Sequence, residues 1–340
     1  MSEITRRNLL GSFGYLALSR ALPAQAPPAP IRTKSLHHMT LNVSDPGRSL
    51  EFYQGLFGLP VQARQGALTV LRIGSGPQFV ALTKVAANAK PGIDHFCMTV
   101  ENFTPDRILK ILAEHGVTKV DTAGAGSLKA WVRMRGEDAG GAKGGTPELY
   151  FTDPDGIRVQ LQDASYCGGA GALGNVCPAA PEPAPRKGLL AVRDLSHFTL
   201  TVSDARRSRE FYQGLFNLPV QAYQGAMPVL EVGSRAQFLA LAGGGGAPSI
   251  NHACMTMEGF DPDKVIKTLS DFGVKPRGDS RGPVGPLKSY VSMRMEDRGG
   301  ARGGTPELYF TDPDGILMQL QDVSYCGGAG YLGEQCPALA

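Results

Sequence analysis

The chain has 340 residues, a formal net charge of +3 and 19% charged against 42% hydrophobic residues. This composition is that of a soluble globular protein and excludes a disordered or membrane-spanning chain. The length is too great for one ordinary domain and suits two of about 150 residues each. No run of like charge stands out, so nucleic acid is not an expected partner.

Residues 1–26 have the order of a signal peptide. Arg6 and Arg7 precede a short apolar run that ends near Leu18, and Ala24-Gln25-Ala26 offers a cleavage site with small residues. The paired arginines resemble a twin-arginine signal, whose route exports folded proteins. The alternative is a frayed basic terminus. We expect a periplasmic or secreted protein without membrane attachment after processing, because the apolar run is too short to span a bilayer.

The dominant feature of the remaining sequence is an internal duplication. Residues 144–157 recur without change as residues 303–316, at a spacing of about 159 residues. Such a repeat is long enough for each copy to be a domain. We therefore predict a first domain over 33–166, a cysteine-containing tail and Pro/Ala-rich linker over 167–190, a second domain over 191–325, and a cysteine-containing tail over 326–340.

Each copy is predicted to contain two βαβββ modules. In the first module, Asp45-Pro46 supplies a helix N-cap followed by proline at the first helical position. Thr104-Pro105 repeats this signal in the second module. The turn Asp153-Pro-Asp-Gly156 separates the last two strands. The expected strands of the first copy are 36–43, 61–63, 68–73, 78–83, 93–100, 128–135, 147–151 and 157–162, with helices over 46–57 and from 105 to about 115. The predicted fold class is α+β, with a cupped mixed sheet in each domain.

Alternation along these strands gives one apolar and one polar face, and the polar face carries histidine at the start of every module. The chain has six histidines, and four of them occupy these matching positions: His38, His95, His197 and His252. Histidines from two pseudo-symmetric modules could converge on one point, as a metal ion requires. The alternative is that the imidazoles are simply satisfied by hydrogen bonds within the strands and loops.

This arrangement resembles the vicinal oxygen chelate superfamily, which includes glyoxalase I, extradiol dioxygenases, fosfomycin-resistance transferases and bleomycin-binding proteins. The segment from Leu149 to Gln160 is similar to the closing signature of extradiol dioxygenases. The resemblance makes His38 and His95 metal ligands, places Gln160 at the carboxylate position, and places the phenol of Tyr150 beside them. The corresponding set in the second domain is His197, His252, Gln319 and Tyr309. The implied cofactor is a divalent ion such as Fe, Mn, Zn or Ni.

Two departures from that pattern bear on the chemistry. Glutamine replaces the carboxylate ligand in both copies, which leaves the charge of the ion uncompensated and disfavours ferrous oxygen chemistry. A histidine expected shortly before Leu149 is missing, and Lys143 and Arg302 lie roughly at its place in the two copies. Glu148 and Glu307 are the nearest alternative carboxylates, as a base or a shifted ligand, although an exposed strand-end glutamate is the commoner outcome.

The chain has six cysteines, three in each copy of the repeat, at corresponding positions. Cys97 and Cys254 lie on the histidine face, where packing as small apolar groups is the commoner role and metal ligation the alternative. Cys167 with Cys177, and Cys326 with Cys336, follow the final strand of each domain. In an exported chain this spacing indicates disulfides, each contributing roughly 2–3 kcal/mol. A thiolate metal site would need further ligands that the tails lack.

The leading functional hypothesis is a metal-dependent enzyme that binds two neighbouring oxygens of a small substrate. Arg135, Arg294, Lys143 and Arg302 are candidates for binding an anionic substrate, with solvated surface charge as the alternative. Dioxygenase chemistry on a catechol-like compound ranks slightly above glyoxalase-like lyase or isomerase chemistry. The competing class is a non-catalytic binding protein of the bleomycin-resistance type, which needs no paired histidines. A monomer or a homodimer is expected.

Overall fold

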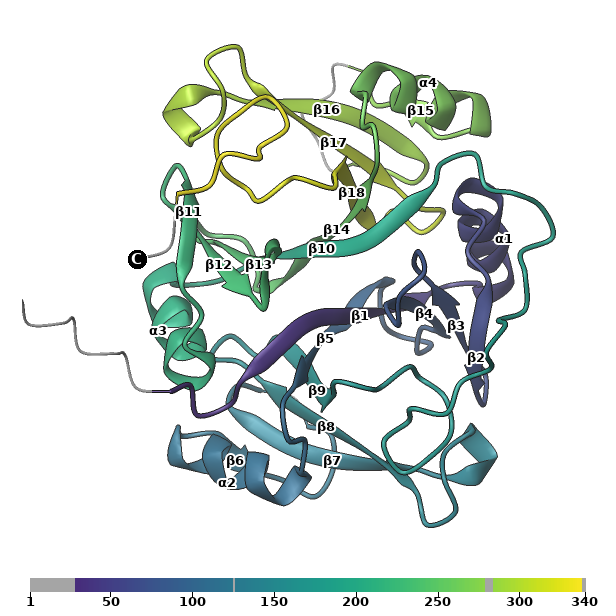
Figure 1. Ribbon diagram of the computed structural model, residues 1–340, viewed down its shortest axis with the longest axis vertical. Coiled ribbons are helices and arrows are strands. Elements are labelled where there is room, and N and C mark those ends of the chain that lie inside the picture. Colours follow the sequence, from purple (N-terminus) through teal and green to yellow (C-terminus); the bar gives the residue numbers. More distant parts are fainter. Residues whose placement is uncertain (1–27, 125, 279–283, 338–340) are drawn as a thin grey trace, which may run out of the picture.

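Two nine-stranded mixed sheets, one from each sequence repeat, form the molecule (Figure 1). The computed structural model describes residues 28–124, 126–278 and 284–337, so the expected signal peptide lies outside the described residues. Within the described part, no helix has both the length and the apolar character needed to cross a membrane.

The first domain follows the expected order of elements. Its elements are β1 (Thr33–Val43), α1 (Pro46–Phe57), β2 (Val61–Gln65), β3 (Leu68–Arg72), β4 (Phe79–Lys84), β5 (Gly92–Val100), α2 (Pro105–Glu114), β6 (Thr118–Lys119), β7 (Lys129–Arg135), a 3-10 turn η1 (Glu137–Ala139), β8 (Thr146–Thr152) and β9 (Arg158–Asp163).

The second domain repeats this order. Its elements are β10 (Val192–Thr201), α3 (Ala205–Phe216), β11 (Val220–Gln224), β12 (Met227–Val232), β13 (Ser234–Ala242), β14 (Ser249–Met257), α4 (Pro262–Phe272), β15 (Lys275–Pro276), β16 (Lys288–Arg294), η2 (Glu296–Arg298), β17 (Thr305–Thr311) and β18 (Leu317–Asp322).

Each sheet joins two βαβββ modules along their first strands. The order in the first sheet is β2-β3-β4-β1-β5-β9-β8-β7-β6, and the second sheet has the equivalent order. Strand β1 pairs with β4 in parallel and with β5 in antiparallel orientation, while β5 pairs with β9 in parallel. The predicted fold class is therefore confirmed. The short strands β6 and β15 were not expected, because two residues are too few to show a periodic pattern.

The predicted cap signals are only partly confirmed. Asp45 accepts hydrogen bonds from the first helical N–H groups of α1, as its sequence position indicates. Thr104 stands at the N-cap of α2 but makes no capping side-chain hydrogen bond. Its counterpart Asp261 does cap α4. The turn after β8 closes as predicted, with Gly156 at a positive φ of 84°.

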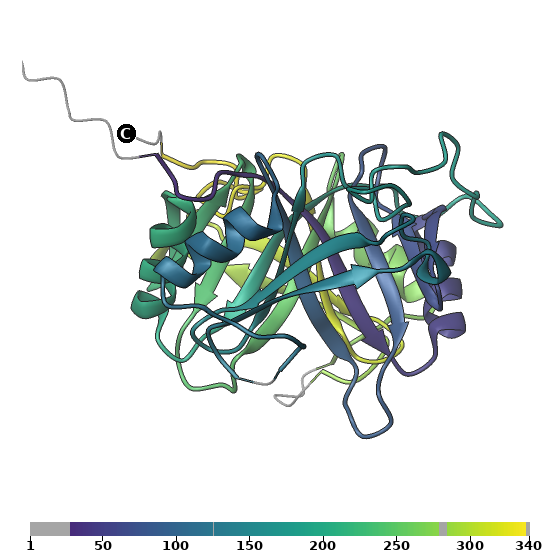
Figure 2. The same ribbon diagram turned by 90° about the horizontal axis from the view of Figure 1, so that it is seen from below.

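The apolar faces of both sheets and the helices form one continuous core across the two domains. Phe96 of β5 stacks on Phe198 of β10, with ring centroids 4.9 Å apart. Helix α3 of the second domain packs Phe216 against Phe151 of the first, and α1 packs Phe57 against Phe310 in return. Helices α1 and α3 consequently lie at opposite flanks of the molecule (Figure 2).

Two buried glutamines join the central strands β1 and β10. Gln78 accepts a hydrogen bond from the Leu195 N–H at 2.8 Å and donates to the Leu36 carbonyl at 2.8 Å. Gln237 reciprocates, accepting from the Leu36 N–H at 3.0 Å and donating to the Leu195 carbonyl at 3.0 Å. The amides thus satisfy backbone groups at irregular points of both strands, which would otherwise be buried without partners.

Each domain also inserts its Asp-Pro-Asp-Gly turn against a helix of the other. The Tyr212 hydroxyl of α3 donates to Asp153 at 3.1 Å, and the Tyr53 hydroxyl of α1 donates to Asp312 at 3.3 Å. Both carboxyl groups are fully buried. Burial raises the pKa of each to about 6, although backbone N–H donors partly oppose the shift.

These two aspartates predict a loss of stability as the pH rises. A carboxyl group with a raised pKa favours the protonated folded state, so its contribution is complete below the unfolded pKa of 3.8 and is lost as the pH rises through about 6. The free energy of unfolding should fall between pH 4 and pH 7 by up to about 3 kcal/mol per carboxyl group. Urea titrations at several pH values should show that the free energy of unfolding of Asp153→Asn/Asp312→Asn depends less on pH than that of the wild type. The exposed control Asp138→Asn should follow the wild type, and an equally steep double variant contradicts this account.

Two disulfides close the tails that follow the last strands. Cys167 pairs with Cys177 and Cys326 pairs with Cys336, as the spacing predicted. Cys97 and Cys254 are free and buried. The first disulfide loop accepts a hydrogen bond from Arg135 on the Gly169 carbonyl at 2.8 Å. Arg294 makes the same contact with Gly328 in the second domain, so each disulfide loop is bound to the last residue of β7 or β16.

Alkylation of the oxidised protein tests this pairing. Native protein should resist labelling, because the two free thiols are buried. Unfolding without reductant should expose two cysteines per chain, and unfolding with reductant should expose all six. Labelling of more than two cysteines in unfolded, unreduced protein contradicts the disulfides. In Cys97→Ser/Cys254→Ser, the unfolded protein should not be labelled unless reductant is added.

Candidate metal centres

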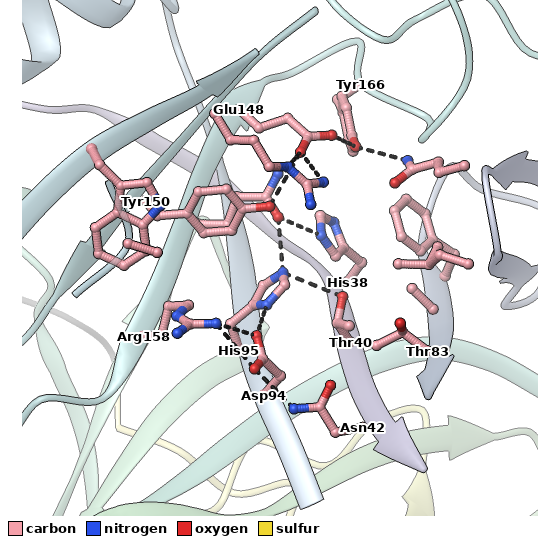
Figure 3. Close-up of a pocket in the computed structure, with 18 residues that line it drawn as sticks. His38, Thr40, Asn42, Thr83, Asp94, His95, Glu148, Tyr150, Arg158 and Tyr166 are labelled. Atoms are coloured by element: carbon pink, nitrogen blue, oxygen red, sulfur yellow. Dashed lines mark hydrogen bonds and ion pairs between the residues drawn. The ribbon is translucent and has the colours of Figure 1, made fainter. Parts of the chain in front are cut away.

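The first domain brings together the three residues predicted as metal ligands. His38 lies on β1, His95 on β5 and Gln160 on β9, three strands adjacent in the sheet. The Nε2 atoms of His38 and His95 lie 3.0 and 2.9 Å from Oε1 of Gln160. Both imidazoles therefore point at one atom inside the cup (Figure 3).

The second domain repeats this geometry with its own three predicted ligands. The Nε2 atoms of His197 and His252 lie 3.0 and 2.9 Å from Oε1 of Gln319. All six side chains are almost fully buried. Each cup is built from the two modules of a single domain, so neither needs a second chain to bring its three predicted ligands together.

Each of these four histidines directly follows the extra residue of a β-bulge, and the side chain of that extra residue contacts Nδ1 of the histidine. On β1, Leu36 pairs with Met98 and His38 with Cys97, so His37 is the extra residue. A bulge bends the strand and re-aims a side chain, which lets consecutive residues reach one another. The four Nδ1 contacts are His37 Nδ1 to His38 at 2.9 Å, Asp94 Oδ2 to His95 at 2.7 Å, Ser196 Oγ to His197 at 3.2 Å and Asn251 Oδ1 to His252 at 2.9 Å.

These partners fix which ring nitrogen carries the proton. The oxygens of Asp94 and Asn251 can only accept, so His95 and His252 hold their proton on Nδ1. Ser196 donates its hydroxyl hydrogen to the Ala236 carbonyl at 3.0 Å and so accepts from His197. The neutral forms of all three rings then present an Nε2 lone pair to the glutamine oxygen.

Converging acceptor atoms repel one another unless a cation or a proton lies between them. Burial lowers the pKa of His252 to about 4 and that of His197 well below its usual value, so both rings are neutral near pH 7. Nitrogen and oxygen ligands at bond lengths of about 2.1 Å stand about 3 Å apart around a metal, which matches these contacts. Within the described part of the chain, the buried amide nitrogens of Gln160 and Gln319 have no hydrogen-bond partner, and the oxygen of each amide contacts the two imidazoles. The residues therefore fit a divalent ion.

A cavity of about 200 Å³ opens over the first centre. It is smaller than the sites that hold drug-sized ligands, so it has room for a small molecule. On one wall, Trp131 stacks on Tyr150 with centroids 5.6 Å apart. The cavity is lined by His38, Thr40, Asn42, Gln65, Leu68, Phe79, Ala81, Thr83, Asp94, His95, Ala123, Trp131, Arg133, Glu148, Tyr150, Arg158, Gln160 and Tyr166.

Glu148 is the buried anion of this cup. Its carboxylate accepts from Nε of Arg135 and from Nε of Arg133, both at 2.8 Å. The hydroxyls of Tyr150 and Tyr166 also donate to it, each at 3.3 Å. Burial and the adjacent Glu148 charge raise the pKa of Tyr150 well above its usual value, so this phenol stays protonated. Glu307 is held in the same way by Arg294 at 2.7 Å and by Tyr309 at 3.2 Å.

The predicted anion-binding cations lie elsewhere than in the cup. Arg135 and Arg294 are buried, bind the glutamates and donate to carbonyls of the disulfide loops. Lys143 and Arg302 are exposed in turns before β8 and β17. The charged residues that do line the first cup beside Glu148 are Asp94, Arg133 and Arg158, none of which the strand pattern singled out.

His37, His38 and Cys97 form a further cluster whose ligand atoms lie within 4.8 Å of one another. All three are buried, and burial raises the pKa of the Cys97 thiol well above its usual value. The thiol is accordingly protonated. His37 has no counterpart in the second copy, where Ser196 stands at its position.

Both sequence repeats match the same known protein family. The family model of the glyoxalase/bleomycin resistance protein/dioxygenase superfamily matches residues 35–161 and again 194–320. The chain therefore belongs to this superfamily, and the resemblance inferred from sequence is confirmed.

Individual relatives come from several branches of that superfamily. The glutathione transferase FosA of Serratia marcescens is 28% identical over 137 residues, which are 39% of this chain and 82% of that protein. The Mn(II)-bound glyoxalase from Novosphingobium aromaticivorans has a TM-score of 0.55 at 16% identity, over 85% of this chain and 82% of its own. Homoprotocatechuate 2,3-dioxygenase from Arthrobacter globiformis has a TM-score of 0.57 at 18% identity, over 89% and 84%. At these identities the two solved structures show the common fold alone.

The proton positions are testable without any metal. In metal-free protein near pH 7, long-range proton–nitrogen NMR should show His252 as a neutral ring protonated on Nδ1, and the neutral form of His95 should carry its proton on the same atom. In Asp94→Ala the constraint on His95 is removed, so its proton should shift toward Nε2, where Gln160 can accept it. His252 should be unchanged and serves as the internal control. A protonated Nε2 on His95 in the wild type contradicts the assignment.

Proposed function

We propose that each cup holds one divalent metal ion and that the protein is an exported enzyme acting on a small, oxygen-rich substrate. The observation that carries the proposal is the convergence of two imidazole Nε2 atoms on a glutamine oxygen in both cups. The partners on Nδ1 support it, because metal-binding histidines characteristically donate their other ring N–H to a carboxylate or carbonyl.

The ligands would be His38, His95 and Gln160 in one cup and His197, His252 and Gln319 in the other. A bound ion would act there as a Lewis acid for two neighbouring substrate oxygens. Phe79 stacks on His38 with centroids 4.2 Å apart and keeps that ring in place. Tyr150 holds its proton, and its ring makes a T-shaped contact with His95, with centroids 5.2 Å apart. These contacts would orient the substrate and exclude water from one side of the centre.

Two reaction classes are candidates. The segment from Leu149 to Gln160 favours dioxygenase-like cleavage of a catechol-type ring, and a homoprotocatechuate dioxygenase is among the proteins of the same fold. The neutral Gln160 favours the second class, a glyoxalase-like lyase or isomerase, because a site without a carboxylate leaves the ion a stronger Lewis acid. A non-catalytic binding protein would have no use for the histidine pairs.

Export is the second part of the proposal. The Arg6-Arg7 segment with its apolar run supports a twin-arginine signal. The two disulfides are consistent with an extracellular or periplasmic protein, since such bonds persist in oxidising compartments. Folding before transport would allow the metal to be bound in the cytoplasm.

Metal analysis of natively exported protein tests the proposal. We expect about two ions per chain for the wild type and about one for His95→Ala, because one cup would lose a ligand. Gln160→Glu should bind its ion more tightly, since a carboxylate compensates charge that an amide leaves. Oxygen uptake with a catechol then separates the two reaction classes. A wild-type chain that binds neither Mn, Fe, Zn nor Ni at stoichiometric levels overturns the metal centre.

A further inference from the structure

The two cups share their centres but differ in charged residues at the wall, one of which lies beside the buried glutamate. On β7, Arg133 pairs with Glu148 across the strand, and on β16 the equivalent partner of Glu307 is Ser292. Glu148 therefore contacts two guanidinium groups, from Arg133 and Arg135, whereas Glu307 contacts that of Arg294. The first cup carries an additional positive charge beside its buried carboxylate.

Arg133 is placed to meet a ligand as well as Glu148. It binds Glu148 through Nε and Nη2, and within the described residues its Nη1 group has no hydrogen-bond partner. Its side chain is 54% exposed, although it lines the cavity. The guanidinium carbon lies 5.9 Å from the centroid of the Tyr150 ring. The Nη1 group of Arg133 can therefore donate hydrogen bonds to a ligand that lies against the aromatic rings of Tyr150 and Trp131.

Both cups carry an arginine over the outer aromatic residue of the wall, although the two arginines come from different positions of the repeat, and Leu317 stands at the position of Arg158. Arg158 lies over Trp131 in the first cup, at 5.5 Å from the ring centroid, and Arg277 lies over Tyr290 in the second, at 5.4 Å. Arg158 is also bound to Asp94 through Nη1, at 2.8 Å. The contrast between Arg133 and Ser292 is the charge difference that lies over Tyr150 and beside the buried carboxylate.

We propose that Arg133 makes the first cup selective for anionic planar substrates, such as aromatic carboxylates, while the second cup prefers their uncharged counterparts. The proposal rests on the proposed function for the identity of the centre, and adds the substrate class of each cup. Charge-assisted hydrogen bonds of guanidinium to carboxylate are strong and directional. A substrate that binds the ion through two oxygens would direct its carboxylate along the aromatic wall to Arg133.

The sequence supplies a reporter for each cup. Trp131 is the chain's single tryptophan and lines the first cup, so its fluorescence reports ligand binding there alone. Exchanging the wall residues in Trp131→Tyr/Tyr290→Trp transfers the reporter to the second cup, where Tyr290 stacks on Tyr309 at 5.1 Å. Protocatechuate and catechol are matched probes, because they differ by one carboxylate.

Fluorescence titrations with both probes test the proposal. In the wild type, protocatechuate should bind at least about tenfold more tightly than catechol, the factor expected for one charge-assisted hydrogen bond. Arg133→Ser should bring that ratio close to one without weakening catechol, and Arg133→Lys should keep part of the preference. In the chain with the transferred reporter the ratio should be near one, and adding Ser292→Arg should raise it.

Each titration is run with Mn(II)-loaded and with metal-free protein, so that two failures remain distinct. Equal affinities with and without Mn(II) contradict the metal centre, while the ratio of the two probes still reports on Arg133. A ratio that survives Arg133→Ser overturns the selectivity, as does an equal ratio in the second cup. The absence of saturable quenching by protocatechuate also overturns it.

Discussion

Two imidazole nitrogens held about 3 Å from one amide oxygen in a buried cup are the constraint on which the rest of this structure depends. Two imidazoles and one amide oxygen would repel one another without a positive charge between them. The fold holds them together because three adjacent strands carry one residue each, and because a bulge beside each histidine supplies a partner for Nδ1. The polar centre is thereby preorganised by the protein's own hydrogen bonds.

The same bulges connect the centres to the interface between the domains. Leu36 and Leu195 lie immediately before the bulged residues, and their backbone groups bond to Gln237 and Gln78. Each of these glutamines bonds to the central strands of both domains. The orientation of His38 and His197 is therefore supported by residues of both repeats. This agrees with the shared core and with the packing of α1 and α3 against the opposite domain.

The sequence predicted those parts of the site that follow from periodicity and repetition. Alternation placed His38, His95 and Gln160 on one face, and the duplication identified their counterparts. It failed where a strand is irregular: regular alternation assigns Asp94 to the opposite face from His95, but the bulge brings its carboxylate to the ring. The recurrence of a polar residue directly before each histidine was the available signal. The commitment of Arg135 to Glu148 could not be foreseen, because it depends on a contact between strands.

The reciprocal docking of turns onto helices has a wider consequence. An arrangement in which each half offers the same surface to the other is that of a symmetric dimer, here contained in one polypeptide. In a true homodimer every amino-acid change alters both active centres at once. Joining the halves removes that coupling. One repeat can therefore carry Asp94 beside its histidine while the other carries Asn251 at the corresponding position, and both sheets keep the same fold. Covalent fusion thus gives a two-fold architecture the freedom to specialise one half at a time.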